Sequence, residues 1–344
     1  MKILVLGGSR FLGRAFVEEA LSQNHEITIF NRGNQNACLK DVEILTGDRF
    51  GDLNELKTRY WDTVLDTSGF IPYTIKNSTE LLKDRLNHYT FISSISVYQD
   101  WVPENLDEAY PVLDISLEKA NELSKDVNGP IYEYYGHFKA LGEKIVEENF
   151  PGKFLNVRAG QLIGPNDYTD RIPYWVHRVA MGGKVLVPGS PNRRIQLIDN
   201  KDLSQWILNM MTSSSTGTFN ATGPNYPLTM EEFIDACIRV TGADVEIVWV
   251  NEEFLLEQNV APWTEMPLWV PVNSPLSPEL EKAWKGAFSI NIDKAVQSGL
   301  TFRKLDESLT EIYDWEKTRS LGEVEWKSGM RAEREKELLT LLNK

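Results

Sequence analysis

The sequence predicts an α/β protein in which a doubly wound parallel sheet carries a smaller cap toward the C-terminus. Short apolar runs alternate with helical patterns through the first half of the chain. The first apolar run leads straight into a glycine-rich turn, and prolines become frequent after Pro165. Strands that alternate with helices require crossover connections, which favour a mostly parallel sheet. The change of composition after Pro165 favours a second, smaller unit.

The first half of the chain contains the expected core of the sheet. Apolar runs of strand length occupy residues 2–6, 26–30, 42–45, 63–65, 89–92 and 154–157. Apolar residues recur at helical spacing within residues 11–22, 75–86 and 132–148. Residues 100–130 are acidic and contain several prolines, so we expect a surface excursion with little regular structure there.

A glycine turn joins the first strand to the first helix. Arg10 stands where the pattern Gly-x-x-Gly-x-x-Gly usually has its middle glycine. Glycines here let the backbone approach a pyrophosphate, which the unpaired N–H groups of the helix N-terminus bind. The turn predicts a Rossmann-type dinucleotide site, and a tight turn without a ligand is the alternative. The expected cofactor contacts in the turn are Gly7, Ser9, Arg10, Phe11, Leu12 and Gly13.

The end of the second strand bears on the choice between NAD and NADP. Asn31 and Arg32 stand where NAD-preferring folds place an acid against the ribose hydroxyls. A guanidinium can bind a 2′-phosphate through paired hydrogen bonds, so we expect NADP(H) to be favoured over NAD(H). Arg32 capping a turn is the alternative. Asp48, after the third strand, is expected either to accept from the adenine amino group or to cap a helix.

A tyrosine and a lysine share one face of the helix expected over residues 132–148. Tyr135 and Lys139 are four residues apart, which places them side by side. An ammonium beside a phenol favours the phenolate, so we expect a lowered pKa and a general acid/base role for Tyr135. Ser94 ends the fifth strand, where its hydroxyl could bind a substrate carbonyl. The alternatives are that Tyr135 and Lys139 only pack in the core or lie on the surface, and that Ser94 only forms hydrogen bonds with backbone groups at the strand end.

Taken in order, these motifs resemble those of the extended short-chain dehydrogenase/reductases, the NAD-dependent epimerase/dehydratase group. Within that group the chain is similar to the branch whose glycine turn reads Gly-Gly-Thr/Ser-Arg-Phe-Leu-Gly. Further matching motifs are Phe30-Asn31-Arg32-Gly33, Asp66-Thr67-Ser68-Gly69, Ser93-Ser94-Ile95-Ser96-Val97-Tyr98, Tyr135 with Lys139, and Gly164-Pro165. Two departures are Arg10 within the turn and Gln99 after Val-Tyr, and the asparagine of the family's usual tetrad has no assigned position here.

The resemblance implies roles for particular residues. The catalytic set would be Ser94, Tyr135 and Lys139. Beyond the glycine turn, the cofactor contacts would be Asn31, Arg32, Asp48, Thr67, Ser68, Gly69 and Lys139. Residues 164–175 resemble a substrate-side loop. The candidate substrate residues are Ser96, Arg158, Asp167, Arg171, Trp175, Arg194, Trp263 and Trp269.

The expected domains follow the change in composition. Residues 1–165 would form most of the dinucleotide-binding domain, with parts of 195–222 returning to it. Residues 166–194 and 223–320 would form a substrate-binding cap, and 321–344 a helical tail. The proline-rich stretch 261–271 holds Trp263 and Trp269, which we expect to wall the substrate pocket, or alternatively to fill the gap between cap and sheet.

Composition narrows the range of partners. The formal net charge of −14 disfavours nucleic acid, and a hydrophobic fraction of 42% suits a globular protein. The two cysteines, Cys38 and Cys237, lack metal-ligand spacing, so we expect no metal and a reduced compartment. No apolar run reaches the roughly 18 residues that a membrane helix needs. We therefore expect a cytoplasmic protein without a membrane partner.

The leading function is an NAD(P)-dependent oxidoreductase or epimerase that acts on a sugar-like or other carbonyl/hydroxyl small molecule. Two alternatives stay open. One is a redox-sensing regulator that binds the dinucleotide without turnover. The other is an RNA-binding relative of the chloroplast stem-loop-binding proteins, which the branch also resembles. The resemblance also implies a possible homodimer, formed through the helices that carry Tyr135 and residues 75–86.

Overall fold

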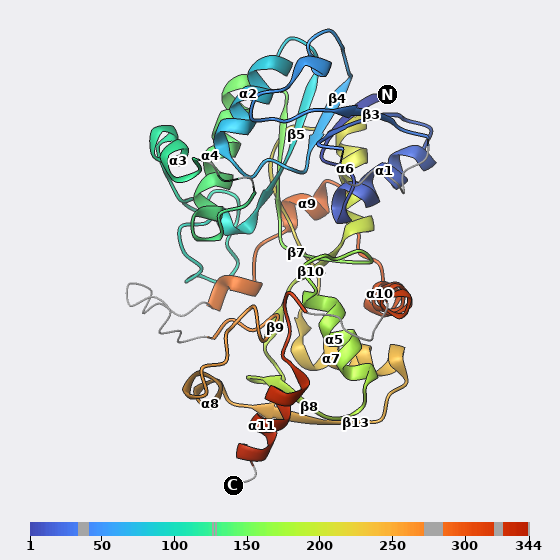
Figure 1. The fold of residues 1–344 in the computed structure, drawn as a ribbon, viewed down its shortest axis with the longest axis vertical. Helices are drawn as coiled ribbons and strands as arrows, with labels where there is room; N and C mark the ends of the chain where they lie inside the picture. The colour runs from blue at the N-terminus through green and yellow to red at the C-terminus, as the bar shows by residue number, and fades with distance from the viewer. Residues whose placement is uncertain (34–40, 126, 128, 272–284, 320–325, 343–344) are drawn as a thin grey trace.

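The structure, a computed structural model, describes residues 1–33, 41–125, 127, 129–271, 285–319 and 326–342. The chain forms two parts that follow one another along the long axis of the molecule (Figure 1). The N-terminus lies in the upper part of that view, and the C-terminal helix lies at the far end of the lower part. Among the described residues, no helix has both the length and the apolar character needed to cross a membrane.

The upper part contains a seven-stranded parallel sheet, which confirms the predicted fold class. Its strand order is β11-β6-β5-β4-β1-β2-β3. The strands are β1 (Lys2–Leu6), β2 (Glu26–Asn31), β3 (Glu43–Thr46), β4 (Thr63–Asp66), β5 (His88–Ser94), β6 (Phe154–Ala159) and β11 (Gly217–Ala221). The order reverses between β1 and β4, and ligands of such sheets bind beyond the carboxyl ends of the strands at that point.

Helices cover both faces of this sheet. On one face α1 (Phe11–Ser22) packs against α6 (Asn200–Thr212). On the other α2 (Pro72–Leu82) packs against α4 (Tyr135–Asn149), and α3 (Leu117–Leu123) lies against α2 (Figure 1). Three 3₁₀ turns fall between these elements, at Asn54–Leu56, Ile95–Val97 (η2) and Tyr132–Tyr134.

The excursion over residues 100–130 has more regular structure than the sequence predicts. Helix α3 lies within it. Ser116 caps this helix by accepting a hydrogen bond of 3.1 Å from the Lys119 N–H. Ala120, completely buried, packs with Ile71 and Phe138. One serine cap and one small buried residue thus stabilise a helix in a stretch whose prolines favour loops.

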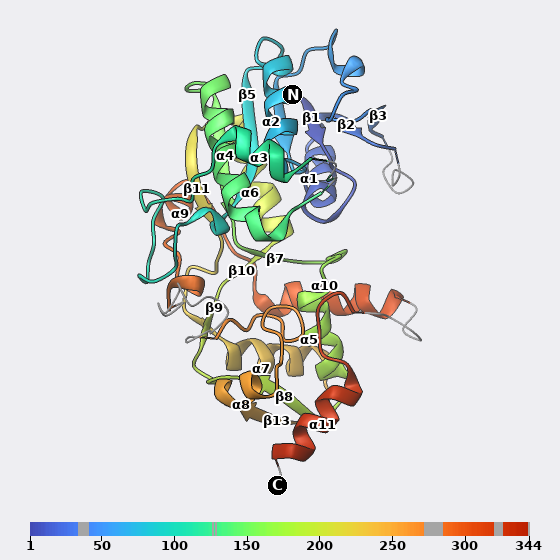
Figure 2. The same ribbon diagram turned by 60° about the vertical axis from the view of Figure 1, so that its left-hand side comes forward.

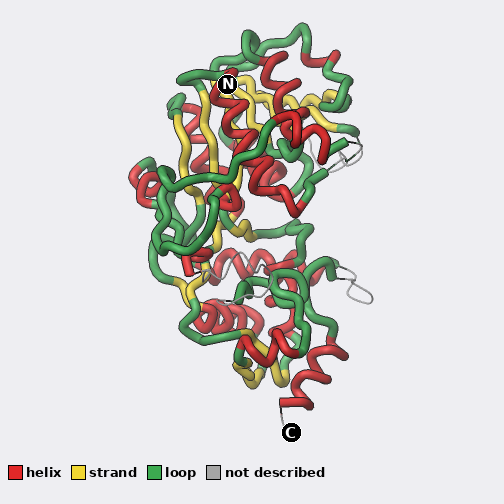
Figure 3. Tube along the Cα trace, turned by 90° about the vertical axis from the view of Figure 1, so that its left-hand side faces the viewer, coloured by secondary structure: helices red, strands yellow, loops and turns green. Residues whose placement is uncertain are grey.

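The lower part is built from short strand pairs and helices (Figure 2). Strands β7 (Gln161–Ile163) and β10 (Leu197–Asp199) run parallel between the two parts. The remaining pairs are β9 (Arg194–Ile195) with β12 (Leu228–Thr229) and β8 (Gly183–Pro188) with β13 (Val245–Val250). The helices are α5 (Arg171–Ala180), α7 (Met230–Thr241), α8 (Glu252–Glu257), α10 (Leu305–Thr318) and α11 (Ala332–Leu342). The seven-stranded sheet lies in the upper part (Figure 3).

One segment of the expected cap packs on the upper part instead. A 3₁₀ turn, η4 (Lys285–Phe288), is followed by α9 (Asp293–Gln297), which lies against the edge strand β11. Ala295 and Leu300 are buried in the same apolar cluster as Phe16 of α1. The alanine fits beside the sheet edge because it is small, a contact that the proline pattern does not reveal.

Candidate active site

The glycine turn has the geometry of a phosphate-binding loop. Gly7 and Gly8 have φ values of +106° and +81°, which favour glycine. Arg10 is extended, with φ −134° and ψ 150°, a conformation that any residue adopts. Arginine at the middle position therefore leaves the turn intact. Helix α1 begins without a side-chain cap, so side chains leave the N–H groups of its first turn uncapped.

Close packing fixes the turn on the sheet. A Cβ on Gly13 would lie 2.7 Å from the Cα of Gly8, so only glycine lets α1 approach the turn this closely. The Thr67 and Ser68 hydroxyls both donate to the Leu6 carbonyl oxygen, at 3.0 and 3.1 Å. Thr67 and Ser68, in the loop after β4, thus support the glycine turn through their side chains. Of the other turn residues, Phe11 and Leu12 are buried and Ser9 is half-buried.

The residues expected around the adenosine ribose lie at the ends of β2 and β3. Arg32 is exposed, and the Asn31 side chain accepts a hydrogen bond of 2.8 Å from the Gly33 N–H. Asp48 accepts from the Phe50 N–H at 3.0 Å and closes its own turn, so its carboxylate stabilises a turn rather than a helix.

The structure contains a buried ion pair, Arg49 with Asp66, that the sequence analysis did not predict. The Arg49 guanidinium donates to both oxygens of Asp66, each at 2.7 Å, and to the Ser68 and Ser78 hydroxyls at 3.2 and 2.6 Å. Burial lowers the pKa of Arg49, but Asp66 more than compensates, so the pKa is raised. The pair ties the end of β4, and hence Ser68, to helix α2. The sequence signal is an arginine next to Asp48, but sequence alone does not show that it turns inward.

Ser94 and Tyr135 come together at the start of α4. The Ser94 hydroxyl lies near enough to the Tyr135 phenol to lower its pKa, and it lies 3.1 Å from the Ser96 hydroxyl. Gly136 makes this approach possible, because a Cβ there would lie 2.0 Å from the Ser96 carbonyl oxygen on η2. The predicted catalytic serine and tyrosine therefore share one site, and Ser96 borders it.

The direction expected for the pKa of Tyr135 is wrong. Burial, and after it the charge of Tyr168, raise the pKa of the phenol to about 12. The hydrogen bond with Ser94 and the charge of Arg171 lower it, but they do not outweigh desolvation. At neutral pH the phenol therefore keeps its proton.

The Lys139 side chain is buried within the upper part of the molecule. Its side chain is 2% exposed, and its Nζ donates to the carbonyl oxygens of Gly69 and Ile92 at 2.9 and 2.7 Å. The Phe70 and Phe91 rings also contact this ammonium, each with its centroid 4.9 Å from Nζ. Burial lowers the pKa of Lys139 to about 8, although the Asp66 carboxylate raises it. The lysine thus titrates near the working range of an acid/base catalyst.

Asp167, Tyr168 and Arg171 reach the same site from the start of α5. Tyr168 and Arg171 both act electrostatically on Tyr135. The Tyr168 ring packs edge-on against Phe11 of the glycine turn, with centroids 6.4 Å apart. The Arg171 guanidinium lies over the Trp263 ring, 5.0 Å from its centroid. Residues 167–171 thus connect the glycine turn, the catalytic tyrosine and the lower part. The sequence analysis did not predict Tyr168 as a residue of the site.

Four candidate substrate residues lie elsewhere. Trp175 and Trp269 are completely buried in the lower part, and their Nε1 atoms donate to the Pro267 carbonyl and to Glu252. Arg158 is buried against Glu143, at 2.8 Å, within the upper part. Arg194 is exposed. Trp175, Trp269 and Arg158 therefore belong to the packed interior, and Arg194 lies on the surface.

Arg193, next to Arg194, is the arginine that points inward. It pairs with Glu252 at 2.8 Å and lies over the Phe288 ring, 5.9 Å from its centroid. Phe288 in turn contacts Trp263, with centroids 6.2 Å apart. The two adjacent arginines look equivalent in sequence, and the contacts of Arg193 with Glu252 and Phe288, far along the chain, distinguish them.

Comparisons with known proteins agree with this architecture. The profile of the NAD dependent epimerase/dehydratase family matches residues 3–222. A putative epimerase from Burkholderia cenocepacia superposes with a TM-score of 0.67 at 15% identity, covering 92% of this chain and 98% of that one. The UDP-glucuronic acid 4-epimerase from Bacillus cereus, solved with NAD, gives 0.64 at 16% identity, covering 92% and 99%. At these identities the likeness shows the fold.

A sequence relative is the chloroplast stem-loop binding protein of 41 kDa b from Arabidopsis thaliana. It is 24% identical over 271 residues, which span 73% of this chain and 66% of the relative. The family profile covers well over half of the chain and includes the glycine turn, Ser94, Tyr135 and Lys139. The chain belongs to the NAD dependent epimerase/dehydratase family, as its motifs predict.

Proposed function

We propose that this chain is a nicotinamide-dependent oxidoreductase or epimerase that acts on a sugar-like carbonyl or hydroxyl compound. The observation that carries the proposal is the convergence of Ser94, Tyr135 and Lys139 beside an intact phosphate-binding turn. A redox-sensing regulator that only binds the dinucleotide has no use for a buried tyrosine and lysine of this kind.

The residues have separable roles. A bound nicotinamide supplies the acceptor and donor of hydride. Tyr135, protonated at neutral pH, gives its proton to a carbonyl oxygen as that oxygen gains charge, and takes a proton back in the opposite direction. Ser94 donates to the same oxygen. Lys139 places a positive charge near the phenol, which favours the phenolate when a proton must be taken up.

The cofactor would be NADP(H) in preference to NAD(H). Arg32 is exposed at the end of β2. The motif Phe30-Asn31-Arg32-Gly33 contains no acidic residue that could bind a ribose hydroxyl. Its guanidinium is available to pair with a 2′-phosphate. The neighbouring proteins of known structure include several solved with NAD, which supports a nicotinamide cofactor of either kind.

The substrate would bind between the upper part and the start of α5. Residues 166–194 and 223–320 would form the substrate-binding part, except for residues 293–300, which pack on the upper part. Neighbours of the same fold include UDP-sugar 4-epimerases and a dTDP-glucose 4,6-dehydratase, which supports a sugar-like substrate. A homodimer through α2 and α4 stays a prediction, and so does a cytoplasmic location.

Titration of the purified protein with NADPH and NADH, read by calorimetry, tests the first step of the proposal. We expect one of the two to bind with a Kd in the micromolar range or below. Gly13→Val would force a Cβ onto Gly8 and should abolish binding. Absence of binding by both dinucleotides would overturn the proposal.

Stem-loop RNA binding is the second candidate, favoured by the name of the chloroplast relative. The net charge of −14 opposes it. A filter assay with a structured RNA at moderate salt separates the two functions. Tight, salt-sensitive retention of RNA, without dinucleotide binding, would favour the second candidate.

A further inference from the structure

Two buried polar atoms at the start of α5 lack partners within the described part of the chain. They are Oδ2 of Asp167 and Nε of Arg171. One is an acceptor and the other a donor. Unsatisfied buried groups of this kind are rare in folded proteins, and a bound ligand is one of the few physical reasons for them. Both residues lie beside Tyr168, which contacts the glycine turn through Phe11.

The guanidinium of Arg171 packs on an aromatic ring and does not pair with an acidic side chain of the described residues. Trp263 lies under it at 5.0 Å, and across the ranges that the structure describes the guanidinium makes no ion pair. Arg171 is the first residue of a ten-residue helix, α5, whose positive dipole end also favours an anion. Burial lowers its pKa, and the nearby Asp167 charge raises it. The protein thus keeps a desolvated positive charge that its own acids do not pair.

Asp167 offers the complementary group. Its side chain is completely buried, and its Oδ1 accepts from the N–H and the hydroxyl of Thr169 at 2.8 and 2.7 Å. Burial raises the pKa of this carboxyl, while Thr169 and Arg171 lower it. Its second oxygen therefore remains to accept a hydrogen bond from a donor on a ligand, such as a hydroxyl.

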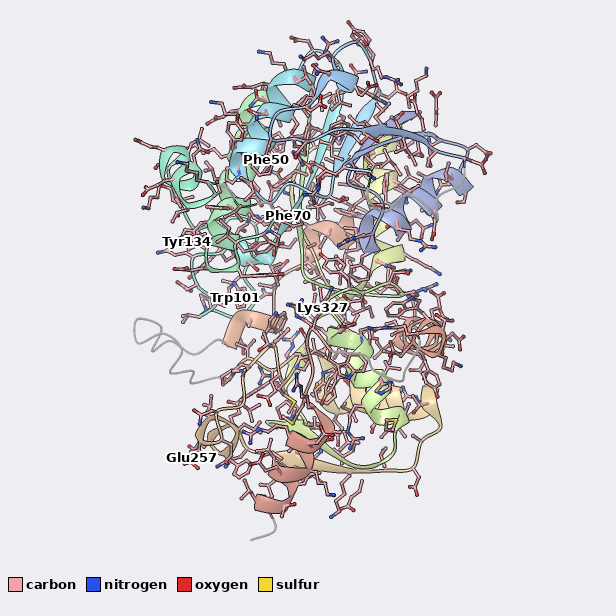
Figure 4. All side chains as sticks on the ribbon, in the orientation of Figure 1. Phe50, Phe70, Trp101, Tyr134, Glu257 and Lys327 are labelled. Atoms are coloured by element: carbon pink, nitrogen blue, oxygen red, sulfur yellow. The ribbon has the colours of Figure 1, made fainter. Side chains whose placement is uncertain are left out.

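Both residues act electrostatically on a tyrosine of this site. The charge of Arg171 acts on Tyr135, and that of Asp167 acts on Tyr168. More positive charge borders the same place: Arg10 acts on Tyr168, and the Lys327 ammonium lies over the Tyr168 ring, 5.5 Å from its centroid. Lys327 stands at the junction of the two parts (Figure 4). In a chain with a net charge of −14, this concentration of cations singles out the site.

We propose that the substrate is a polyhydroxylated anion, whose oxyanion group is bound by Arg171 on the Trp263 face and whose neighbouring hydroxyl donates to Asp167. This inference rests on the proposed function, because it places the anion next to the carbon on which Tyr135 acts. The oxyanion is a carboxylate, as in a sugar acid, or a phosphate, as in a sugar phosphate. Both satisfy the guanidinium in the same way.

The experiment uses the protein saturated with the nicotinamide cofactor that it prefers. Calorimetry at constant ionic strength compares D-glucuronate, D-glucose 6-phosphate and neutral D-glucose. We expect one of the two anions to bind at least about tenfold more tightly than D-glucose, and the better one identifies the oxyanion. Inorganic phosphate, which has no sugar hydroxyl, should bind more weakly than the better anion.

Variants assign the contacts. Arg171→Gln should remove the preference for the anion, and Asp167→Asn should weaken the hydroxylated anion several-fold more than inorganic phosphate. Lys184→Gln is the matched control, because it removes an exposed positive charge that pairs with Glu246 on the surface of the lower part. The affinity for the cofactor should change less than twofold in all three variants.

Each failure has a separate meaning. If the protein binds the dinucleotide but neither anion binds more tightly than D-glucose, the inference about the substrate is wrong and the proposed function stands. If Arg171→Gln weakens the cofactor instead of the anion, Arg171 is a cofactor ligand and the inference is again wrong. If no dinucleotide binds, the proposed function itself fails.

Discussion

The Lys139 ammonium lies 5.7 Å from the centroid of the Tyr135 ring. At the same time it donates hydrogen bonds to two main-chain carbonyl oxygens, those of Gly69 and Ile92. The lysine therefore contacts the face of the Tyr135 ring, and it also links the ends of β4 and β5 to α4. This double position governs what changes at either residue are expected to do.

Replacing Tyr135 by phenylalanine removes the phenol oxygen and leaves the ring in place. We expect turnover to fall by at least about 100-fold, the usual contribution of a positioned general acid. The thermal midpoint and the cofactor affinity should stay close to those of the wild type. Steady-state kinetics and calorimetry check both, and near wild-type turnover would remove Tyr135 from the catalytic role.

Replacing Lys139 by methionine should change how stability depends on pH. The folded-state pKa is about 8 against an ordinary value of 10.5. Between these values the unfolded chain binds more protons than the folded one, so this lysine makes the free energy of unfolding rise with pH, by up to about 3 kcal/mol. Below pH 8 its destabilising effect is fully present. Urea unfolding at several pH values should show this rise in the wild type and not in Lys139→Met, and parallel curves would contradict it.

Arg49→Ala leaves the Asp66 carboxylate buried without its partner. Breaking a buried pair in this way costs about 3–5 kcal/mol of unfolding free energy. Arg59 is the control, since its pair with Glu43 is exposed and Arg59→Ala should cost less than about 1 kcal/mol. Chemical denaturation of both variants measures the difference. Equal losses would show that the Arg49–Asp66 pair is not the support of the β4 loop.

The two tryptophans of residues 261–271 should behave differently. Trp269 is completely buried, so Trp269→Ala should cost about 3–5 kcal/mol of stability. Trp263 is partly exposed and lies against Arg171, so Trp263→Ala should mainly weaken substrate. Thermal unfolding and substrate affinity, measured for both, decide the assignment. A stability loss at Trp263 as large as that at Trp269 would make it a core residue.

The choice of cofactor depends on Arg32 in this account. We expect the wild type to bind NADPH at least about tenfold more tightly than NADH, and Arg32→Ala to reduce the ratio toward one. Arg59→Ala, which removes a charge near the neighbouring strand, should leave the ratio unchanged. A preference for NADH that survives Arg32→Ala would refute the assignment.

The upper part was predictable because its signals are local. The strand and helix patterns of residues 2–92 match the structure to within a few residues, and the glycine turn needs only its own glycines. Ser94 could be named because it ends a strand of a parallel sheet. Tyr135 and Lys139 could be named because they are four residues apart on one helix and match the family's motif. Their pKa values could not, because burial, not the nearest charge, sets the value for Tyr135.

The lower part was less predictable because tertiary packing decides its side chains. Nothing in the sequence separates Trp263 from Trp269 or Arg194 from Arg193, yet one member of each pair is turned away from the site. Arg49 is similar, since its inward course depends on Asp66 on another strand. Contacts between residues far apart in the chain determine all three.

The most direct test of the central claim is the absorbance of the bound nicotinamide near 340 nm during turnover. The cofactor-saturated protein is mixed with a panel of anionic and neutral sugars and sugar nucleotides, and the product is identified by mass and by sugar composition. The account predicts that any substrate turned over changes this absorbance, transiently for an epimerase and lastingly for a reductase, and that Tyr135→Phe shows no such change. Product formed without an absorbance change, or an equal change in Tyr135→Phe, would contradict it.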